Sequence, residues 1–579
     1  MIKRLAACVR QYKKDSILTP LYVTMEVVLE VIIPLLMARL IDFGIDGGSM
    51  SYIVKMGVAL VVAAIISLIF GALSGRSAAI ASAGFAKNLR HDMFYNVQGF
   101  SFSNIDKFST ASIVTRLTTD ITNIQNAYQM IIRIAVRCPV MLIFSLIMAF
   151  SINHQLSLIF LACIPILGVG LYLIMSKAHP IFERVFKTYD KLNNVVQENL
   201  RGIRVVKSFV REDYEKEKFG TISEDIYNDF SKAEKTLAYN MPLMQFCVFA
   251  SMLLISWFGA RLIVGSTMTT GELMSLITYT MQILMSLMML SMVFVMITIS
   301  RASAERIVEV LNEESDLHNP KHPVYEVKDG AIRFDNVEFS YKKGSGKPCL
   351  KGINLTINAG ETVGIIGGTG SSKSSLVQLI PRLYDVTEGS VSVGGVDVRD
   401  YDIETLRNEV AMVLQKNVLF SGTIKENLRW GSENATDEEL VHACKLAQAD
   451  GFITQFPDGY DTYIEQGGTN VSGGQKQRLC IARALLKKPK ILILDDSTSA
   501  VDTQTDAQIR QAMRDEIPGT TKLIIAQRIS SIEDADKIIV LDEGEINAVG
   551  THEELLETNE IYREVYTSQQ KGGLGNGNA

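Results

Sequence analysis

Residues 361–380 read ETVGIIGGTGSSKSSLVQLI. The apolar run ETVGII predicts a strand, GGTGSSKS at 367–374 predicts a loop of small residues, and SLVQLI predicts the start of a helix. This order is typical of a P-loop, in which backbone amides and a helix N-terminus hold phosphate. We expect Lys373 to reach the outer phosphates and the Ser374 hydroxyl to bind Mg²⁺. The candidate phosphate-binding residues are Gly367, Gly368, Thr369, Gly370, Ser371, Ser372, Lys373, Ser374 and Ser375.

One position of this loop departs from the P-loop pattern. The pattern G-x-x-x-x-G-K-[ST] requires glycine where this sequence has Ser372. A Cβ atom there is expected to crowd a backbone that must approach phosphate closely.

Two further motifs accompany the loop. The run KILILDDSTSAVD at 490–502 predicts a buried strand ending in paired acids, and Asp495 is placed to hold Mg²⁺ through water. Before it, NVSGGQKQR at 470–478 predicts a loop that opens a helix and exposes backbone amides to an anion. A surface turn and a capped helix are poor explanations once all three motifs occur together.

With these motifs the chain resembles a half-transporter of the ATP-binding cassette (ABC) exporter family, of the multidrug or lipid exporter type, over nearly its whole length. The resemblance implies ATP and Mg²⁺ as cofactors. It also implies an adenine-stacking role for Tyr341 and a Mg²⁺-contacting role for Gln415, the glutamine of the Q-loop. The residues that resemble the signature loop and the D-loop aspartate are Ser472, Gly473, Gly474, Gln475 and Asp502.

Two catalytic positions of the family are altered. The general base, a Glu after the Mg²⁺-binding Asp, is Asp496 here, and a displacement of about 1 Å can slow a reaction on the order of a hundredfold. The switch histidine is Gln527, whose amide cannot titrate. The signature loop is intact except for Val471 in place of Leu.

In this family two cassettes meet head to tail, and each ATP lies between the P-loop of one and the signature loop of the other. We therefore interpret Asp496 and Gln527 as degenerate catalytic residues, and expect a heterodimer with a second ABC half-transporter that has an intact catalytic Glu and switch His. Two alternatives remain: a homodimer with slow ATPase activity, or a nucleotide-gated regulatory membrane protein that does not pump. An importer and a peptide-processing exporter fit less well, because the cassette shares the chain and no protease domain precedes the first apolar segment.

The first half of the chain is apolar enough to cross a bilayer six times, since each crossing needs about 20 residues. The predicted segments are 17–40, 53–75, 129–151, 156–176, 241–263 and 273–297. Connections 76–128 and 177–240 are rich in Lys and Arg, which places them, both termini and the C-terminal half in the cytoplasm. Their helical periodicity indicates that the helices continue beyond the membrane.

We expect an all-α six-helix exporter domain in the membrane and an α/β P-loop ABC nucleotide-binding domain. The expected boundaries are 1–311 for the membrane domain, 312–330 for a linker, 331–567 for the nucleotide-binding domain and 568–579 for a disordered tail. The resemblance further implies that 109–120 and 202–213 contact the cassettes, and that the fourth and fifth helices cross to the partner subunit.

Composition narrows the possible partners. The 579 residues carry 57 Lys and Arg against 63 Asp and Glu, a net charge of −6 that argues against nucleic acid. The seven scattered cysteines lack metal-ligand spacing and are expected to be reduced core residues. The expected partners are the lipid bilayer and a hydrophobic or amphiphilic cargo, in a bacterial cell membrane.

Glu26 and Glu30 lie four residues apart, on one face of the first predicted span. Acids inside a membrane face either a cavity or a partner. The pair could attract cationic cargo, it could bind a basic residue of a neighbouring helix such as Arg133 or Arg137, or it could lie near the membrane interface. Seven methionines in the sixth span, from Met274 to Met296, could accept varied ligands or only pack helices.

Overall fold

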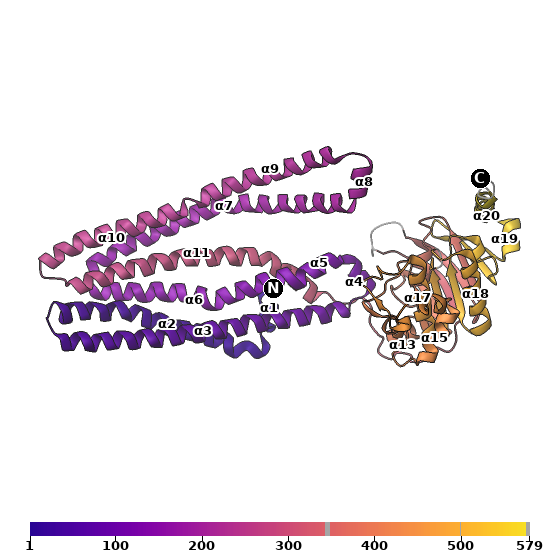
Figure 1. Cartoon of the computed structure of the whole chain (residues 1–579), viewed down its shortest axis with the longest axis horizontal. Coiled ribbons are helices and arrows are strands. Elements are labelled where there is room, and N and C mark those ends of the chain that lie inside the picture. The colour runs from indigo at the N-terminus through magenta and orange to yellow at the C-terminus, as the bar shows by residue number, and fades with distance from the viewer. Residues whose placement is uncertain (342–347, 498–499, 575–579) are drawn as a thin grey trace. The chain divides into compact units, whose positions relative to one another are not determined.

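The structure, a computed structural model, describes residues 1–341, 348–497 and 500–574 (Figure 1). Contacts between residues divide the chain into two units. The membrane unit is Met1–Gln98 with Thr110–Glu313, and the cassette unit is Gly99–Ser109 with Glu314–Ala579. The short segment Gly99–Ser109 therefore belongs to the cassette unit, although both of its neighbours in sequence belong to the membrane unit.

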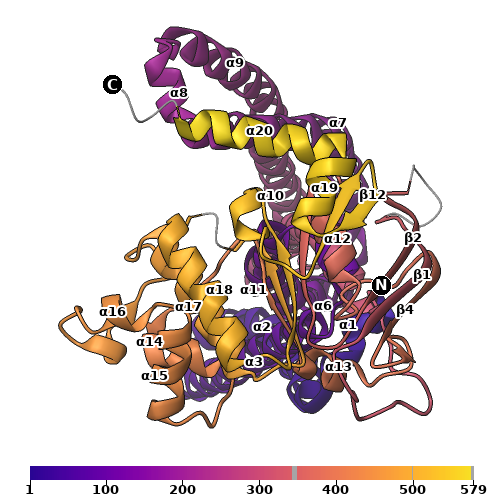
Figure 2. The same cartoon turned by 90° about the vertical axis from the view of Figure 1, so that its right-hand side faces the viewer.

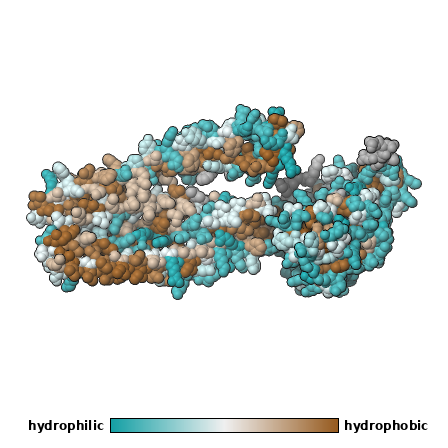
Figure 3. Space-filling view, viewed as in Figure 1, coloured by the Kyte–Doolittle hydropathy of each residue, from teal (hydrophilic) through white to brown (hydrophobic). Residues whose placement is uncertain are grey.

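The membrane unit is helical. Its elements are α1 Ile2–Ala7, η1 Arg10–Tyr12, α2 Lys13–Arg39, η2 Leu40–Ile45, α3 Met50–Gln98, α5 Thr110–Thr115, η3 Arg116–Asp120, α6 Ile121–Ile152, α7 His154–Arg201, α8 Ile203–Ser208, α9 Glu212–Leu237, α10 Asn240–Val264 and α11 Thr270–Asn312. Among the described residues, six helical stretches are long and apolar enough to cross a membrane, which confirms the six predicted spans. They are 36 to 53 residues long, so the helices continue well past the bilayer, as predicted. Figure 3 shows apolar side chains gathered over one part of these helices.

The core of the membrane unit is built by residues at helical spacing. Val23, Val27 and Val31 are buried and lie on one face of α2, against α6 and α11. Tyr279 of α11 is fully buried, and its hydroxyl donates to the Val31 carbonyl at 2.7 Å. The one polar atom of this side chain is therefore satisfied inside an apolar core.

Residues 109–120 were expected to contact the cassette, and this stays a prediction. Thr110–Asp120 lies in the membrane unit, where Asp120 is 1% exposed and accepts hydrogen bonds from Ser303 and from the Arg306 guanidinium. Arg116 donates to Glu309 at 2.8 Å. A buried charge needs a partner, and the charged partners of Asp120 and Arg116, which are Arg306 and Glu309, lie on α11. The preceding segment Gly99–Ser109, with helix α4 Phe102–Lys107, belongs to the cassette unit.

The cassette unit has two large sheets and the short antiparallel pair β7-β8, which confirms the predicted α/β fold. The strands are β1 Ile332–Phe339, β2 Leu350–Ile357, β3 Thr362–Gly367, β4 Glu388–Val393, β5 Val396–Asp397, β6 Val410–Val413, β7 Gly422–Thr423, β8 Tyr463–Ile464, β9 Ile491–Asp495, β10 Thr521–Ile525, β11 Lys537–Asp542 and β12 Glu545–Gly550. The larger sheet has the order β12-β11-β3-β10-β9-β6, parallel except for β12. The antiparallel sheet has the order β2-β1-β4-β5.

Helices cover the larger sheet. Beyond α4 they are α12 Lys373–Gln378, α13 Ile403–Glu409, α14 Ile424–Arg429, α15 Asp437–Leu446, α16 Asp450–Ile453, η4 Gly459–Asp461, α17 Gly473–Leu486, α18 Thr503–Glu516, η5 Ile529–Ser531, α19 His552–Thr558 and α20 Glu560–Leu574. Figure 2 shows α14 to α18 on one side of the sheet and the antiparallel strands on the other.

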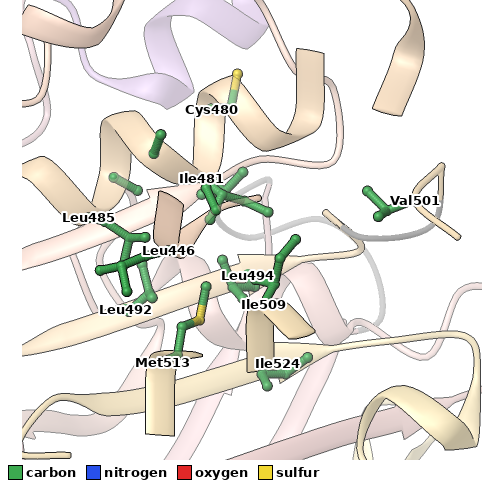
Figure 4. Close-up of a cluster of buried hydrophobic side chains, with 14 of the residues drawn as sticks. Leu446, Cys480, Ile481, Leu485, Leu492, Leu494, Val501, Ile509, Met513 and Ile524 are labelled. Carbon is green, nitrogen blue, oxygen red and sulfur yellow. The ribbon is translucent and has the colours of Figure 1, made fainter. Parts of the chain in front are cut away.

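A dry core fixes the strands that carry the functional residues. Every residue of β9 and β10 is buried. Figure 4 shows Ile481 and Leu485 of α17 and Met513 of α18 packed against Leu492 and Leu494 of β9. Because β3, β9 and β10 are parallel, their carboxyl ends reach one edge of the sheet.

Two further expectations meet the structure here. All seven cysteines are free, and six of them are buried. The tail, expected to be disordered from residue 568, is instead helical as far as Leu574, because α20 begins at Glu560 and continues without a break. The rest of the tail, 575–579, lies outside the described residues.

Candidate nucleotide-binding site

The candidate site lies at the carboxyl edge of the parallel sheet. The P-loop follows β3, the paired acids end β9, and Gln527 follows β10. Ile525 pairs with Ile365 on one side and with Asp495 on the other, so the three strand ends are in register. The sheet thereby gathers residues that lie more than 150 positions apart in the sequence.

The backbone of the P-loop turns through the left-handed region twice. Gly370 has φ +87° and Ser372 has φ +67°. Glycine adopts this conformation at no steric cost, whereas other residues lose about 1–2 kcal/mol. Ser372 is also the N-cap of α12, and its side chain makes no capping hydrogen bond. The serine therefore occupies a position whose geometry favours glycine, as the motif implied.

Lys373 folds back over the loop. Its Nζ donates to the carbonyls of Gly367 at 2.9 Å and Gly368 at 2.8 Å. Burial lowers the pKa of Lys373, and the nearby Asp495 and Asp496 act in the opposite direction. The ammonium is thus held beside the loop whose amides would receive phosphate.

Ser374 and Asp495 form the pair best placed to hold Mg²⁺. The Ser374 hydroxyl donates to Asp495 Oδ1 at 3.0 Å. Asp495 is 4% exposed, and burial raises its pKa. A hydroxyl and a carboxylate in contact are oxygen donors of the kind that Mg²⁺ prefers. In the described part of the chain Gln415 is exposed beyond β6 and has no side-chain hydrogen bond to this pair.

The two altered catalytic positions contact each other. Gln527 Nε2 donates to Asp496 Oδ2 at 2.8 Å. Asp496 is 9% exposed and has φ +49°, a backbone angle that non-glycine residues rarely adopt. Strain of this kind is typical of functional sites.

The predicted adenine-stacking residue sits beside the P-loop helix. Tyr341 is 49% exposed, and its hydroxyl lies 2.9 Å from Ser375 Oγ. Phe339 and Tyr384 pack against the ring, with centroids 4.9 and 5.2 Å away. One part of the ring is therefore held by the protein while another part remains accessible.

The signature-like loop begins α17. Ser472 and Gln475 form a reciprocal capping box, with Gln475 N donating to Ser472 Oγ at 3.3 Å. A Cβ on Gly474 would lie 2.8 Å from the Ala500 carbonyl, so a side chain there would force this contact apart. Asp502 caps α18 and accepts from Thr505 N at 2.9 Å. Among the described residues no hydrogen bond joins Ser472–Gln475 to the P-loop of the same chain.

In the membrane unit, the structure pairs Glu26 and Glu30 with Arg137. Arg137 Nη1 lies 2.7 Å from Glu26, and Nη2 lies 2.6 Å from Glu30. Ser74 of α3 donates to Glu26 at 3.4 Å. This pairing is one of the alternatives that the spacing left open. Arg133, one turn earlier on α6, has no carboxylate partner in the described part of the chain.

Sequence reasoning missed Tyr384, which packs against Tyr341, and also Phe102 and Asp106, which each contact Tyr384. A single aromatic residue after a P-loop helix carries no recognisable pattern. Only the folded chain brings residue 106 to residue 384.

The fold and the site define an ATP-binding unit on the same chain as six membrane spans. Residues 17–303 match the family model of the ABC transporter transmembrane region, and residues 350–499 match that of the ABC transporter. The chain belongs to the ABC transporter family, as a half-transporter of the exporter type and a multi-pass membrane protein with a transport ATPase unit.

Similar proteins cover most of the chain. An uncharacterized ABC transporter ATP-binding protein of Bacillus subtilis, YfiB, is 37% identical and covers 91% of each chain. An ATP-dependent lipid A-core flippase of Desulfotalea psychrophila is 33% identical over 83% of this chain and 84% of its own. The structure of a bacterial Atm1-family ABC exporter with ATP bound superposes with a TM-score of 0.82 at 25% identity, over 97% of this chain and 99% of the other.

Proposed function

We propose that this chain is the degenerate subunit of a heterodimeric ABC exporter. It holds ATP and Mg²⁺ on its own P-loop, hydrolyses that ATP slowly or not at all, and supplies its signature loop to the hydrolytic site of a partner with an intact Glu and His. The single observation that carries this proposal is the hydrogen bond from Gln527 to Asp496.

A general base must present a carboxylate oxygen to the attacking water. Asp496 is one methylene shorter than Glu, and its Oδ2 already accepts from the Gln527 amide at 2.8 Å. The amide is neutral at every pH, so it provides no positive charge for the γ-phosphate. The two substitutions thus point in the same direction, toward weak hydrolysis at this site. The strained Ser372 is a third departure from the family pattern in the same half-site.

The signature loop shows no matching loss. Ser472 caps α17, and Ser472 and Gly473 are exposed at the N-terminus of this helix. A helix N-terminus is suited to bind phosphate. We assign this loop to the partner's ATP.

The cargo that we assign is an amphiphilic or lipid-like compound. The support is the membrane domain together with relatives named as lipid A-core flippases. ATP binding and hydrolysis by the partner would switch the dimer between inward-facing and outward-facing states. The Lys- and Arg-rich inner connections support an orientation with the N-terminus and the cassette in the cytoplasm.

The test is steady-state ATPase activity of the purified full chain in lipid nanodiscs, without any partner. We expect saturable ATP binding and almost no phosphate release. The double variant Asp496→Glu, Gln527→His should gain at least about tenfold in rate, since loss of a positioned general base typically costs 10²–10⁴-fold.

Adding Asp495→Asn to the double variant is the matched control, and it should abolish the gained activity because it removes a proposed Mg²⁺ ligand. Rapid phosphate release by the unmodified chain alone would contradict the proposal and favour an ordinary homodimer.

A further inference from the structure

A row of aromatic rings connects α4 to the candidate nucleotide site inside the cassette unit. The Phe102 ring meets the Tyr384 ring at 6.0 Å and 65°. Tyr384 in turn meets Tyr341 at 5.2 Å and 89°, an edge-to-face contact. Edge-to-face contacts have preferred geometries, so a change in the orientation of one ring alters the orientation that the next ring prefers.

Tyr384, the middle ring of this row, is also held by a hydrogen bond to α4. It is 9% exposed, and its hydroxyl donates to Asp106 Oδ2 of α4 at 2.7 Å. Burial, followed by the nearby Asp106, raises the pKa of Tyr384, so the hydroxyl keeps its proton and remains a donor. A charge-assisted hydrogen bond of this length is stronger than a neutral one.

Helix α4 is held firmly by the cassette unit. Ser101 caps it in a capping box with Asn104. Asn104 Nδ2 donates to the Glu314 carbonyl at 3.1 Å, and Ser103 Oγ donates to Asp316 at 2.8 Å. The chain on either side of this segment continues into α3 and α5 of the membrane unit. A displacement of α4 is therefore transmitted along the backbone to two helices of that unit, α3 and α5.

The other end of the row lies at the proposed base-binding ring. The Tyr341 hydroxyl lies 2.9 Å from Ser375 Oγ, one residue after the proposed Mg²⁺ ligand Ser374. Its ring orientation is set by Phe339 and Tyr384 together. A base that stacks on Tyr341 must either accept this orientation or move Tyr384.

We propose that Tyr384 is a positioning residue that couples the occupancy of the adenine-binding ring Tyr341 to helix α4, through its ring on one side and its bond to Asp106 on the other. The coupling rests on the proposed role of Tyr341 as the adenine platform. It gives the cassette a route, separate from the phosphate-binding loop, by which a bound base constrains the segment that leads into the membrane helices.

Hydrogen exchange of the full chain in lipid nanodiscs tests the coupling, with ATP·Mg²⁺ or inorganic tripolyphosphate·Mg²⁺ as ligand. ATP should slow exchange of the α4 amides, 102–107, and tripolyphosphate should slow it less because it has no base. Tyr384→Phe keeps the ring and removes the bond to Asp106. We expect it to reduce the ATP-induced protection of α4 roughly fivefold, the low end of typical coupling between sites, while the ATP dissociation constant changes less than about twofold.

Asp106→Ala, at an exposed position, should have the same effect, and the double variant should show no further loss. The control is Tyr401→Phe, which removes the hydrogen bond of another buried tyrosine of the cassette unit, to the Val393 carbonyl at 2.8 Å, and should leave α4 unchanged.

Equal protection of α4 in wild type, Tyr384→Phe and Asp106→Ala would overturn the coupling. So would ATP binding to the wild type without any change at α4, and so would equal protection by tripolyphosphate. A dissociation constant for ATP is measured on the same samples by filter binding. If the chain shows no saturable ATP binding, the proposed function and the coupling are both overturned. If ATP binds but α4 does not respond as described, only the coupling is overturned.

Discussion

Ser372 shows how one side chain changes a phosphate-binding loop. Its φ of +67° lies in the left-handed region, and no side-chain capping bond offsets the cost. We predict that Ser372→Gly stabilises the chain by about 1 kcal/mol, because the left-handed conformation disfavours a Cβ atom by about that amount or more. For a domain of this size the thermal midpoint should rise by roughly 2–4 °C.

Thr369→Gly serves as the control for this prediction. Thr369 lies in the same loop without a positive φ, so a glycine there only adds conformational freedom to the unfolded chain. It should lower the midpoint. A fall in the midpoint for Ser372→Gly as well would show that Ser372 is not strained.

The burial of Asp495 should make the stability of the ligand-free chain depend on pH. Burial raises its pKa, and Asp496 adds to this, whereas the Ser374 bond and Lys373 oppose it. A group with a raised pKa stabilises the fold below its ordinary pKa and loses that contribution as the pH rises through the folded-state value. At neutral pH the ionised Asp495 is therefore a cost to the ligand-free chain.

Asp495→Asn should stabilise the ligand-free chain at pH 7.5 by on the order of 1 kcal/mol, a common size for a single substitution. The advantage should shrink as the pH falls toward the ordinary range of an aspartate, and Mg²⁺-dependent ATP binding should weaken. Thermal unfolding at several pH values measures the first effect. An advantage that stays constant with pH would mean that titration of Asp495 does not cause it.

At the scale of elements, the first turn of α17 both caps the helix and forms the proposed signature loop. Ser472 Oγ and Gln475 Oε1 each accept a backbone hydrogen bond there. We predict that Ser472→Ala costs about 1 kcal/mol and lowers ATPase activity in the heterodimer, because the same hydroxyl and amides belong to the proposed signature loop. ATP binding to this chain's own P-loop should not change.

Thr551→Ala is the matched control, since Thr551 and Glu554 form the same capping box on α19. It should lower stability to a similar degree without changing the ATPase activity of the heterodimer beyond that loss. Equal activity losses in the two variants would mean that Ser472 acts only as a cap.

At the scale of the whole molecule, a polar cluster centred on Arg137 and Glu26 links three membrane helices. Arg137 of α6 pairs with Glu26 and Glu30 of α2, and Ser74 of α3 donates to Glu26. The Glu26 side chain is 11% exposed and that of Arg137 is 28% exposed. Removing one partner of such a group leaves uncompensated buried charge, which typically costs about 3–5 kcal/mol.

Arg137→Met should therefore reduce the yield of folded chain after detergent extraction and lower its thermal midpoint. The triple variant Arg137→Met, Glu26→Gln, Glu30→Gln should recover most of the loss, because the charges are then removed together. Arg133→Met, on the same helix, is the control and should have little effect. A triple variant no more stable than Arg137→Met would exclude charge pairing as the cause.

The sequence by itself determined the six membrane spans, the α/β cassette and the order of its motifs. Length and apolar content define a span without reference to neighbours, and a Gly-rich loop between a strand and a helix is a local feature. Only the tertiary structure decided that Arg137 and not Arg133 binds Glu26 and Glu30, that Gln527 contacts Asp496, and that Gly99–Ser109 belongs with the cassette unit while Thr110–Asp120 does not. Each of these depends on which side chains distant segments bring together, and buried charges and polar groups choose partners by proximity in the fold, whatever their separation along the chain.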